Sequence, residues 1–267
     1  MKHALVVIFS ALLLSSCQEV IDIDTPPAAN KLVVEGVIST ETDSSFVRLT
    51  RTLGYFDNTS PIPTVENATV TVNGVAFTHV ANGIYKAPSP YSGSINTRYN
   101  LNVVYEGKTY TSTTLLEPGF DVDTIYSVFK PASGFIPEGY AVKYEATDNR
   151  PRIRYTYFKF GFKNDEDTKG KDSIFDLRVF FDNKDFPLNA PYEFELPLYR
   201  FKEGDSCILI FRSIDEPVFR YLSSIQGSGG NAFFGSPPAN LPTNITGDAL
   251  GLFAAYDVKR YRMRIIK

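Results

Sequence analysis

Residues 68–80 read ATVTVNGVAFTHV, and this stretch decides the fold class. Apolar and polar residues alternate on either side of Asn73-Gly74, and such a pair between alternating runs is the strongest short-range signal for a β-hairpin. A repeat of two residues also means that each strand turns one face to a core and the other to water. The stretch therefore predicts a hairpin in a half-buried antiparallel sheet.

Short runs of the same kind surround this hairpin. They are expected to form strands at residues 31–38, 45–51, 83–86, 99–105 and 108–113. About seven short strands at such a spacing are typical of a sandwich of two antiparallel sheets. We therefore predict an N-terminal β-sandwich over residues 31–118, similar to immunoglobulin or transthyretin domains.

A second β region is predicted over residues 119–267. Its expected strands lie near residues 123–129, 141–146, 153–162, 175–181, 206–212, 249–256 and 261–266. One short helix is expected at about 216–226, where apolar residues recur at spacings of three and four. A long loop rich in Pro, Asn and Gly follows it. The predicted fold class is thus mainly all-β, with two β-sandwich-like domains and one short helix.

The first residues predict export and lipidation. An apolar run over residues 4–14 follows a positively charged tip and is too short to span a bilayer as a stable helix. The next residues resemble the bacterial lipobox, with Leu14, Ser15 and Ser16 before Cys17. We expect residues 1–16 to be a lipoprotein signal peptide, Cys17 to carry the acyl (palmitate-type) anchor, and residues 17–30 to form an extended tether. The acidic residues after Cys17 favour the cell surface over the periplasmic face of the outer membrane.

Composition excludes several classes of site. The chain has 27 Lys and Arg against 30 Asp and Glu, so no overall basic excess exists to neutralise nucleic acid. Beyond Cys17 the single cysteine is Cys207, which lies in an apolar run and is expected to be a buried, inert thiol. His79, the histidine outside the expected signal peptide, is expected to be a solvated strand residue. No metal and no cofactor are expected.

Three weaker patterns have structural alternatives. Residues 164–172 are acidic but lack the glycine and glutamate positions of a calcium-binding loop, so a solvated hairpin tip is favoured. Tyr155 and Tyr157 share one face of a strand and are candidates for stacking on a sugar or another planar ligand, although packing against the neighbouring domain is the stronger alternative. Thr124 and Ser173 lie in Asp-Thr/Ser-Ile triplets that resemble bacterial O-glycosylation sites.

Two distant segments carry a resemblance to a known family. Residues 32–36 read LVVEG, and residues 233–253 read FFGSPPANLPTNITGDALGLF. Together with the lipobox they resemble a family of Bacteroidota outer-membrane lipoproteins, domain of unknown function 4249. Members are often encoded beside TonB-dependent receptors, so the resemblance implies an accessory role in uptake and no catalytic residues. The 233–253 segment either binds a partner or covers a sheet edge of its own domain.

The expected function follows from the anchor, the β pattern and the resemblance. We expect a non-catalytic, surface-exposed lipoprotein that serves a TonB-dependent receptor as an accessory or ligand-capturing subunit, with a glycan or peptide as a possible ligand class. The alternatives are a glycan-active hydrolase that uses a carboxylate pair and a surface adhesin or structural protein.

Overall fold

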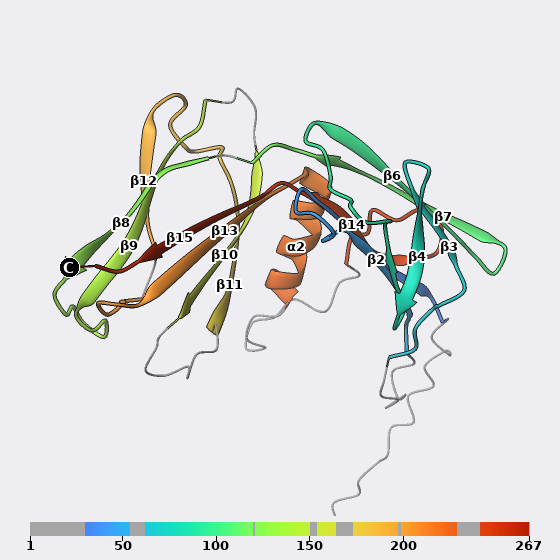
Figure 1. The fold of residues 1–267 in the computed structure, drawn as a ribbon, viewed down its shortest axis with the longest axis horizontal. Coiled ribbons are helices and arrows are strands. Elements are labelled where there is room, and N and C mark those ends of the chain that lie inside the picture. Colours follow the sequence, from blue (N-terminus) through green and yellow to red (C-terminus); the bar gives the residue numbers. More distant parts are fainter. Residues whose placement is uncertain are drawn as a thin grey trace, which may run out of the picture.

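The computed structural model describes residues 30–53, 62–119, 121–149, 154–163, 173–196, 199–228 and 241–266; for residues 162–163, 173–178 and 226–228 it describes the backbone alone. The predicted fold class is confirmed, because the chain is mainly β with one helix in the described part, α2 (Glu216–Ser228). Figure 1 shows two β regions side by side with α2 near their junction.

The first region is built on one sheet of eight strands. In spatial order they are β14 (Leu250–Tyr256), β1 (Leu32–Ser39), β2 (Phe46–Arg51), β5 (Ile84–Lys86), β4 (Val75–Ala81), β3 (Thr69–Val72), β6 (Thr97–Tyr105) and β7 (Lys108–Leu116). The hairpin predicted from the sequence is β3–β4, with Val72 opposite Val75. Asn73 and Gly74 both have positive φ, 46° and 80°, as the tight hairpin turn requires. The inward positions of these strands form one core, including Val34, Leu49, Val72 and Leu101.

A short segment lies between the two end strands of this sheet. On one side the Asn244 side chain donates to Phe253 O (2.7 Å) and accepts from Phe253 N (2.9 Å) on β14. On the other side Thr246 N donates to Thr111 O of β7 at 2.7 Å, and Ser112 Oγ donates to Asn244 O at the same distance. The described part of the segment thus bonds to both end strands of the first sheet, and not to an edge within the region 119–267 to which the sequence assigned it. Residues 233–240 lie outside the described part.

The second region is a sandwich of two smaller sheets. One contains, in spatial order, β11 (Ser173–Asp182), β10 (Tyr155–Lys163), β13 (Ser206–Ile214) and β15 (Val258–Arg264); the other contains β12 (Pro191–Glu195), β9 (Gly139–Thr147) and β8 (Val122–Lys130). Phe158 and Phe211 of the four-stranded sheet meet Tyr144 of the three-stranded sheet, with ring centroids 6.3 and 5.2 Å apart. These aromatic contacts fill the core between the sheets.

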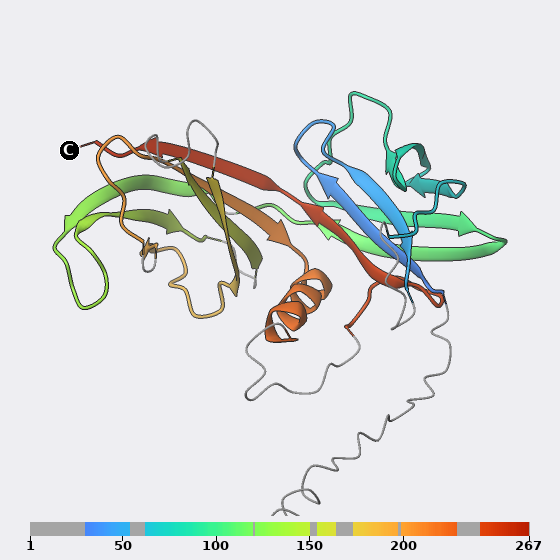
Figure 2. The same cartoon turned by 90° about the horizontal axis from the view of Figure 1, so that it is seen from below.

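One stretch near the end of the chain joins the two regions. Asp257 alone separates β14 from β15, and Figure 2 shows the stretch passing from one region into the other. β14 pairs in parallel with β1, whereas β15 pairs antiparallel with β13. Residues 249–256 were expected as a strand of the second region, and the structure corrects this by placing β14 on the first sheet. The alternation of residues predicts a strand and its faces, but it does not identify the partner strand.

Two glycines allow β1 and β14 to approach closely. Gly251 has a φ of +108° and lies opposite Val34, where an added Cβ would lie 2.0 Å from the carbonyl oxygen of Val34. At Gly36 an added Cβ would lie 2.6 Å from the ring of Phe253. Of the two segments that carried the family resemblance, 32–36 and 233–253, the first therefore packs against residues 250–253 of the second.

Helix α2 begins where the sequence predicts and ends two residues later than expected, at Ser228. Asp215 caps it, because Val218 N donates to Asp215 Oδ1 at 3.2 Å. Val218 is fully buried against Tyr157 and Ala254, which places the helix against both β10 and β14. The apolar face of α2 thus packs at the junction.

Candidate ligand-binding site

The junction between the two regions is fixed by hydrogen bonds to Asp257. The Asp257 carboxylate is buried and accepts from Gly119 N at 2.8 Å and from Thr40 Oγ1 at 3.3 Å. Two hydrogen bonds of 3.1 Å join its backbone to Ser213: Ser213 N donates to Asp257 O, and Asp257 N donates to Ser213 Oγ. Four parts of the chain, around residues 40, 119, 213 and 257, are therefore hydrogen-bonded together at this point.

Asp215 adds a second connection. Its Oδ2 accepts hydrogen bonds from Thr114 Oγ1 (2.8 Å) and Leu115 N (3.1 Å) at the end of β7. The same carboxylate caps α2 through Oδ1. One side chain thus ties the helix of the second region to an edge strand of the first.

A cavity of about 260 Å³ opens between the two regions beside these connections. The first region supplies β1, β2 and the loop between them, and the second region supplies β10, β13 and β15, with β14 between the two. The charged side chains that line it are Glu41, Lys159 and Arg212, and the lining residues with hydroxyl groups are Ser39, Ser44, Tyr157 and Tyr256. Sites between domains are a common location for ligand pockets, so we call this cavity the junction pocket.

Arg212 is the principal cation of the junction pocket. Its guanidinium carbon lies 5.3 Å from the ring centroid of Tyr157. Nη1 is shielded from solvent and, among the residues that the structure describes, has no hydrogen-bond partner. No ion pair to Arg212 occurs within the described ranges either. Arg212 lines the junction pocket, so an anion bound there would be attracted to its positive charge.

Glu41, the acid among the residues that line the junction pocket, is already bound elsewhere. Glu41 accepts hydrogen bonds from Arg260 Nε and Nη2, the second at 2.9 Å. The hydrogen bond from Arg260 lowers the pKa of Glu41, and the charge of Arg212 lowers it further. Glu41 is therefore ionised at neutral pH and hydrogen-bonded to Arg260, and it forms no ion pair with Arg212.

The basic residues continue from the pocket along one face of the four-stranded sheet. In the strand register, Tyr157 lies opposite Arg212, and Lys159 lies in the same row as Ile210 and Arg260. Because side chains alternate along a strand, Arg262 and Arg264 point to the same side as Arg260. We define the basic face as Lys159, Arg212, Arg260, Arg262 and Arg264.

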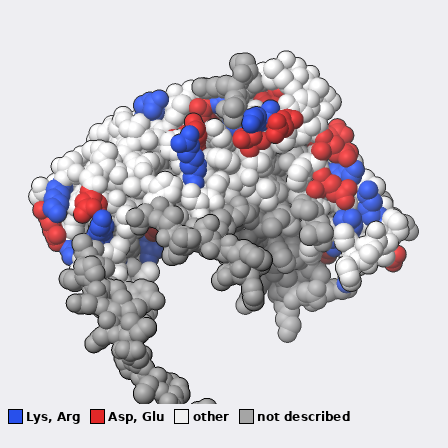
Figure 3. All heavy atoms as spheres, turned by 180° about the vertical axis from the view of Figure 1, so that it is seen from behind, with Lys and Arg blue, Asp and Glu red and all other residues white. Residues whose placement is uncertain are grey.

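Sequence reasoning missed Arg212, Glu41 and the basic face, although one signal for it was present. Residues 260–264 read RYRMR, with arginine at every second position, and this pattern puts the three cations on one face of a strand. The acidic total of the chain concealed this local excess. Figure 3, a view of the side opposite to Figure 1, shows acidic and basic side chains in mixed clusters with uncharged stretches between them.

The two tyrosines proposed to stack on a ligand each pack against another aromatic ring of the protein. Tyr157 is 9% exposed and stacks on Phe180 with a centroid distance of 4.8 Å. Tyr155 stacks on Phe219 of α2 at 4.7 Å. These contacts agree with the alternative of packing at the junction. Tyr157 still lines the junction pocket, but its ring supports Arg212 there and is not an open platform.

Tyr256 lines the same pocket from β14. Burial raises its pKa to about 12, so the phenol is neutral at physiological pH and can donate a hydrogen bond. The pocket thus presents a cation and a neutral hydroxyl, which are both suited to an anionic oxygen.

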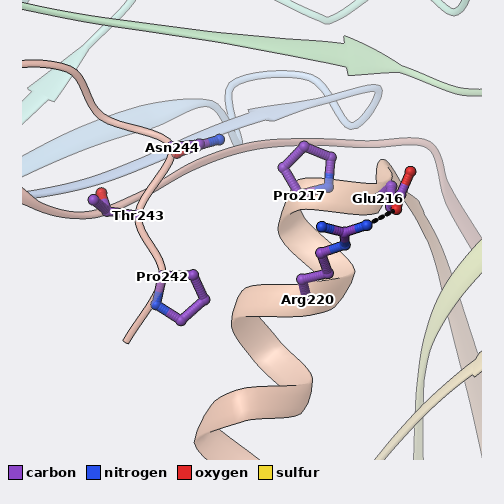
Figure 4. A pocket seen from close by; sticks show the side chains of 6 residues that line it. All are labelled: Glu216, Pro217, Arg220, Pro242, Thr243 and Asn244. Atoms are coloured by element: carbon purple, nitrogen blue, oxygen red, sulfur yellow. Dashed lines mark hydrogen bonds and ion pairs between the residues drawn. The ribbon is translucent and has the colours of Figure 1, made fainter. Parts of the chain in front are cut away.

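A second cavity of about 260 Å³ lies at the start of α2. Figure 4 shows Glu216, Pro217 and Arg220 of the helix on one side and the segment with Pro242, Thr243 and Asn244 on the other. Its charged groups, Glu216 and Arg220, form an ion pair with each other and are largely exposed. Asn244 already bonds β14, so the cavity has few free polar groups to bind a ligand.

Carboxylates meet outside these cavities on the three-stranded sheet. Glu193 lies directly opposite Glu145, and the Tyr126 hydroxyl donates to both. Lys143 Nζ also donates to Glu193 at 2.5 Å. The hydrogen bond to Glu193 raises the pKa of Tyr126 to about 12, and the bond from Lys143 lowers the pKa of Glu193. The cluster is a mutually bonded patch on a sheet surface, and neither cavity above includes it.

Other residues named from the sequence occupy separate places. Cys207 is 2% exposed, and burial raises the pKa of its thiol to about 12, as expected for an inert thiol. His79 is more enclosed than expected, because its ring lies 5.3 Å from Tyr85. Thr124 is exposed on the edge strand β8, and Ser173 begins β11 in the part described by backbone alone. Cys17, the lipobox and residues 164–172 lie outside the described residues.

Within the described ranges, no group of three or more His, Cys, Asp or Glu side chains is placed to hold a metal ion. No helix among these residues is both long and apolar enough to cross a membrane.

The fold and the site define a mainly β protein of two connected regions with a basic pocket at their junction. The chain belongs to the family described as Domain of unknown function (DUF4249), which matches residues 18–262. Comparison with curated proteins finds no significant match, and comparison with solved structures finds none either.

Proposed function

We propose that this protein is a non-catalytic, surface-exposed outer-membrane lipoprotein that captures a ligand for a TonB-dependent receptor. The observation that carries the proposal is the junction pocket, where Arg212 has no acceptor in the described structure. A preformed pocket in a rigid frame binds without the cost of ordering its walls. Lipidation at Cys17 would keep this pocket at the membrane where a receptor operates.

The charge pattern favours binding over hydrolysis by a carboxylate pair. Such a hydrolase holds two acids several ångströms apart across a cleft, with room for the sugar between them. Each of the two cavities described above contains one carboxylate, Glu41 or Glu216, and each of these is paired with an arginine. The pocket chemistry therefore supports ligand capture.

Affinity purification of the lipidated protein from its own outer membrane tests the receptor association. We expect a TonB-dependent receptor in stoichiometric amount by mass spectrometry. Arg212→Gln should retain the receptor, because the pocket binds the ligand, whereas Cys17→Ser should lose both the membrane and the receptor. A clean monomer from native membranes would contradict the proposal, and an attachment defect without a nutrient-specific growth defect in a deletion strain would favour an adhesin.

A further inference from the structure

We propose that the basic face binds a linear anionic glycan, a polysaccharide whose units carry carboxylate or sulfate groups, with one acidic group seated against Arg212 in the junction pocket. This inference rests on the proposed ligand capture and names the chemical class of the ligand. It follows from the state of Arg212, from the pairing of Glu41 and from the direction in which the other arginines continue.

Arg212 provides the anchor point for one acidic group. Its guanidinium is held beside the Tyr157 ring, and its buried Nη1 has no acceptor among the described residues. A planar guanidinium binds carboxylate or sulfate oxygens through parallel hydrogen bonds, which are stronger than bonds between neutral groups. An anionic group in the pocket would thus meet a guanidinium that has no ion-pair partner among the described residues.

Glu41, the acid in the lining of the pocket, does not compete for this position. Glu41 is bound by both Nε and Nη2 of Arg260, and it comes from the loop between β1 and β2 on the other wall. A ligand therefore does not have to break an Arg212–Glu41 ion pair before it binds. The same contact fixes the Arg260 side chain beside the pocket.

Arg262 and Arg264 extend the site away from the pocket. Both are exposed, and neither has an ion-pair partner in the described structure. In the register, Arg212 lies opposite Val258, and Ser206, at the far end of β13, lies opposite Arg264. Residues two apart on a strand are separated by about 7 Å. The arginines thus form a row that a chain with repeated negative charges could follow.

The shape of the site favours a chain over a membrane surface. A bilayer presents a broad surface, whereas Arg212 lies in a pocket between the β1–β2 loop and the four-stranded sheet. The pocket, at about 260 Å³, is smaller than the range of about 300–1,000 Å³ for drug-sized ligands. It therefore suits one unit of a longer ligand whose remaining units lie on the open basic face.

Isothermal titration calorimetry with the full lipidated protein in neutral detergent tests this inference. The probes are oligogalacturonate for carboxylates, dextran sulfate for sulfates and unmodified dextran as the neutral control. We expect binding of at least one charged probe, weaker binding as salt is raised, and none of dextran. The preferred probe identifies which acidic group the site takes.

Two sets of variants locate the binding. Arg212→Gln and the double variant Arg262→Gln/Arg264→Gln should each reduce affinity about tenfold or more, since charged hydrogen bonds are lost. The matched control is Arg98→Gln/Lys108→Gln, which removes two exposed charges from the first region and should change affinity less than about twofold. Because Arg262 and Arg264 are exposed, their variant tests the site even if Arg212→Gln disturbs folding.

Four outcomes would overturn the inference: no binding of either charged polymer, equal binding of dextran, equal losses in the control variant, or stronger binding to poly-glutamate or to anionic phospholipid vesicles. These outcomes are separate from the receptor test. Receptor co-purification without polymer binding would refute the ligand class alone. Arg212-dependent polymer binding without any receptor would refute the transport role and leave the site intact.

Discussion

Replacing Gly251 by alanine should be among the most damaging single changes in this protein. An alanine Cβ would lie 2.0 Å from Val34 O, whereas real Cβ atoms essentially never approach other atoms closer than 3.0 Å. β1 and β14 would therefore have to separate by about 1 Å at this pair, a distortion of the kind that costs about 1–3 kcal/mol in a packed interior. The left-handed φ adds about 1–2 kcal/mol for a residue with a Cβ. We expect a total loss of about 2–5 kcal/mol.

Gly107→Ala is the matched control. Gly107 also has a positive φ, +73°, but an added Cβ there would meet no atom within 4 Å. It should lose only the conformational part, about 1–2 kcal/mol. Urea unfolding followed by circular dichroism and tyrosine fluorescence measures both, since the chain has 16 Tyr and no Trp. Equal unfolding free energies for the two variants would refute the close approach of β1 and β14.

Three further predictions concern stability and ionisation. Asp215→Ala should lower the free energy of unfolding by about 2–4 kcal/mol, because it removes the cap of α2 and leaves two donors of β7 without an acceptor. The control is the exposed neighbour, Glu216→Ala, which should lower it by less than about 0.5 kcal/mol in the same urea titration. With Cys17 acylated or replaced by serine, Cys207 should resist a thiol reagent in the folded protein and react after unfolding. Burial raises the pKa of its thiol from 9.0 to about 12, so between these pH values the thiol ionises in the unfolded chain but not in the folded one. The free energy of unfolding should therefore fall as pH rises from about 9 to about 12. The pKa of Glu41 is lowered in the folded protein, so its ion pair with Arg260 stabilises the fold fully above the ordinary pKa of 4.5. This stabilisation disappears as pH falls through the lower pKa of the folded state. The difference in unfolding free energy between wild type and Glu41→Gln should therefore close in acid.

Local patterns in the sequence predicted local structure well. The Asn73-Gly74 turn gave the β3–β4 hairpin, and the acid-proline start with apolar spacing gave α2. Alternation in β10 correctly separated the core residues Phe158 and Phe160 from Tyr157 and Lys159. These features depend on neighbours in the chain, and neighbours are what periodicity reports.

Long-range pairing could not be predicted in this way. β14 is as strongly patterned as its neighbours, but its parallel partner β1 lies near the other end of the chain. β12, a five-residue edge strand, was not expected at all, because its sequence PYEFE begins with proline and carries two acids. The basic face escaped prediction for a related reason, since it forms only when β10, β13 and β15 lie in register.

The way the regions are joined bears on how a ligand could be captured. A hinge between β regions would require a flexible connection, but here β14 and β15 follow each other directly and each is hydrogen-bonded into a different sheet. Moving one region would break the ladder to β1 or to β13, together with the bonds of Asp257 and Asp215. Such an opening is local unfolding and carries a corresponding free-energy cost. Under the proposed function, affinity for the ligand therefore comes from a preformed site. Release to a receptor depends on competition for the ligand or for the exposed arginines of β15. It does not depend on opening and closing of the two regions.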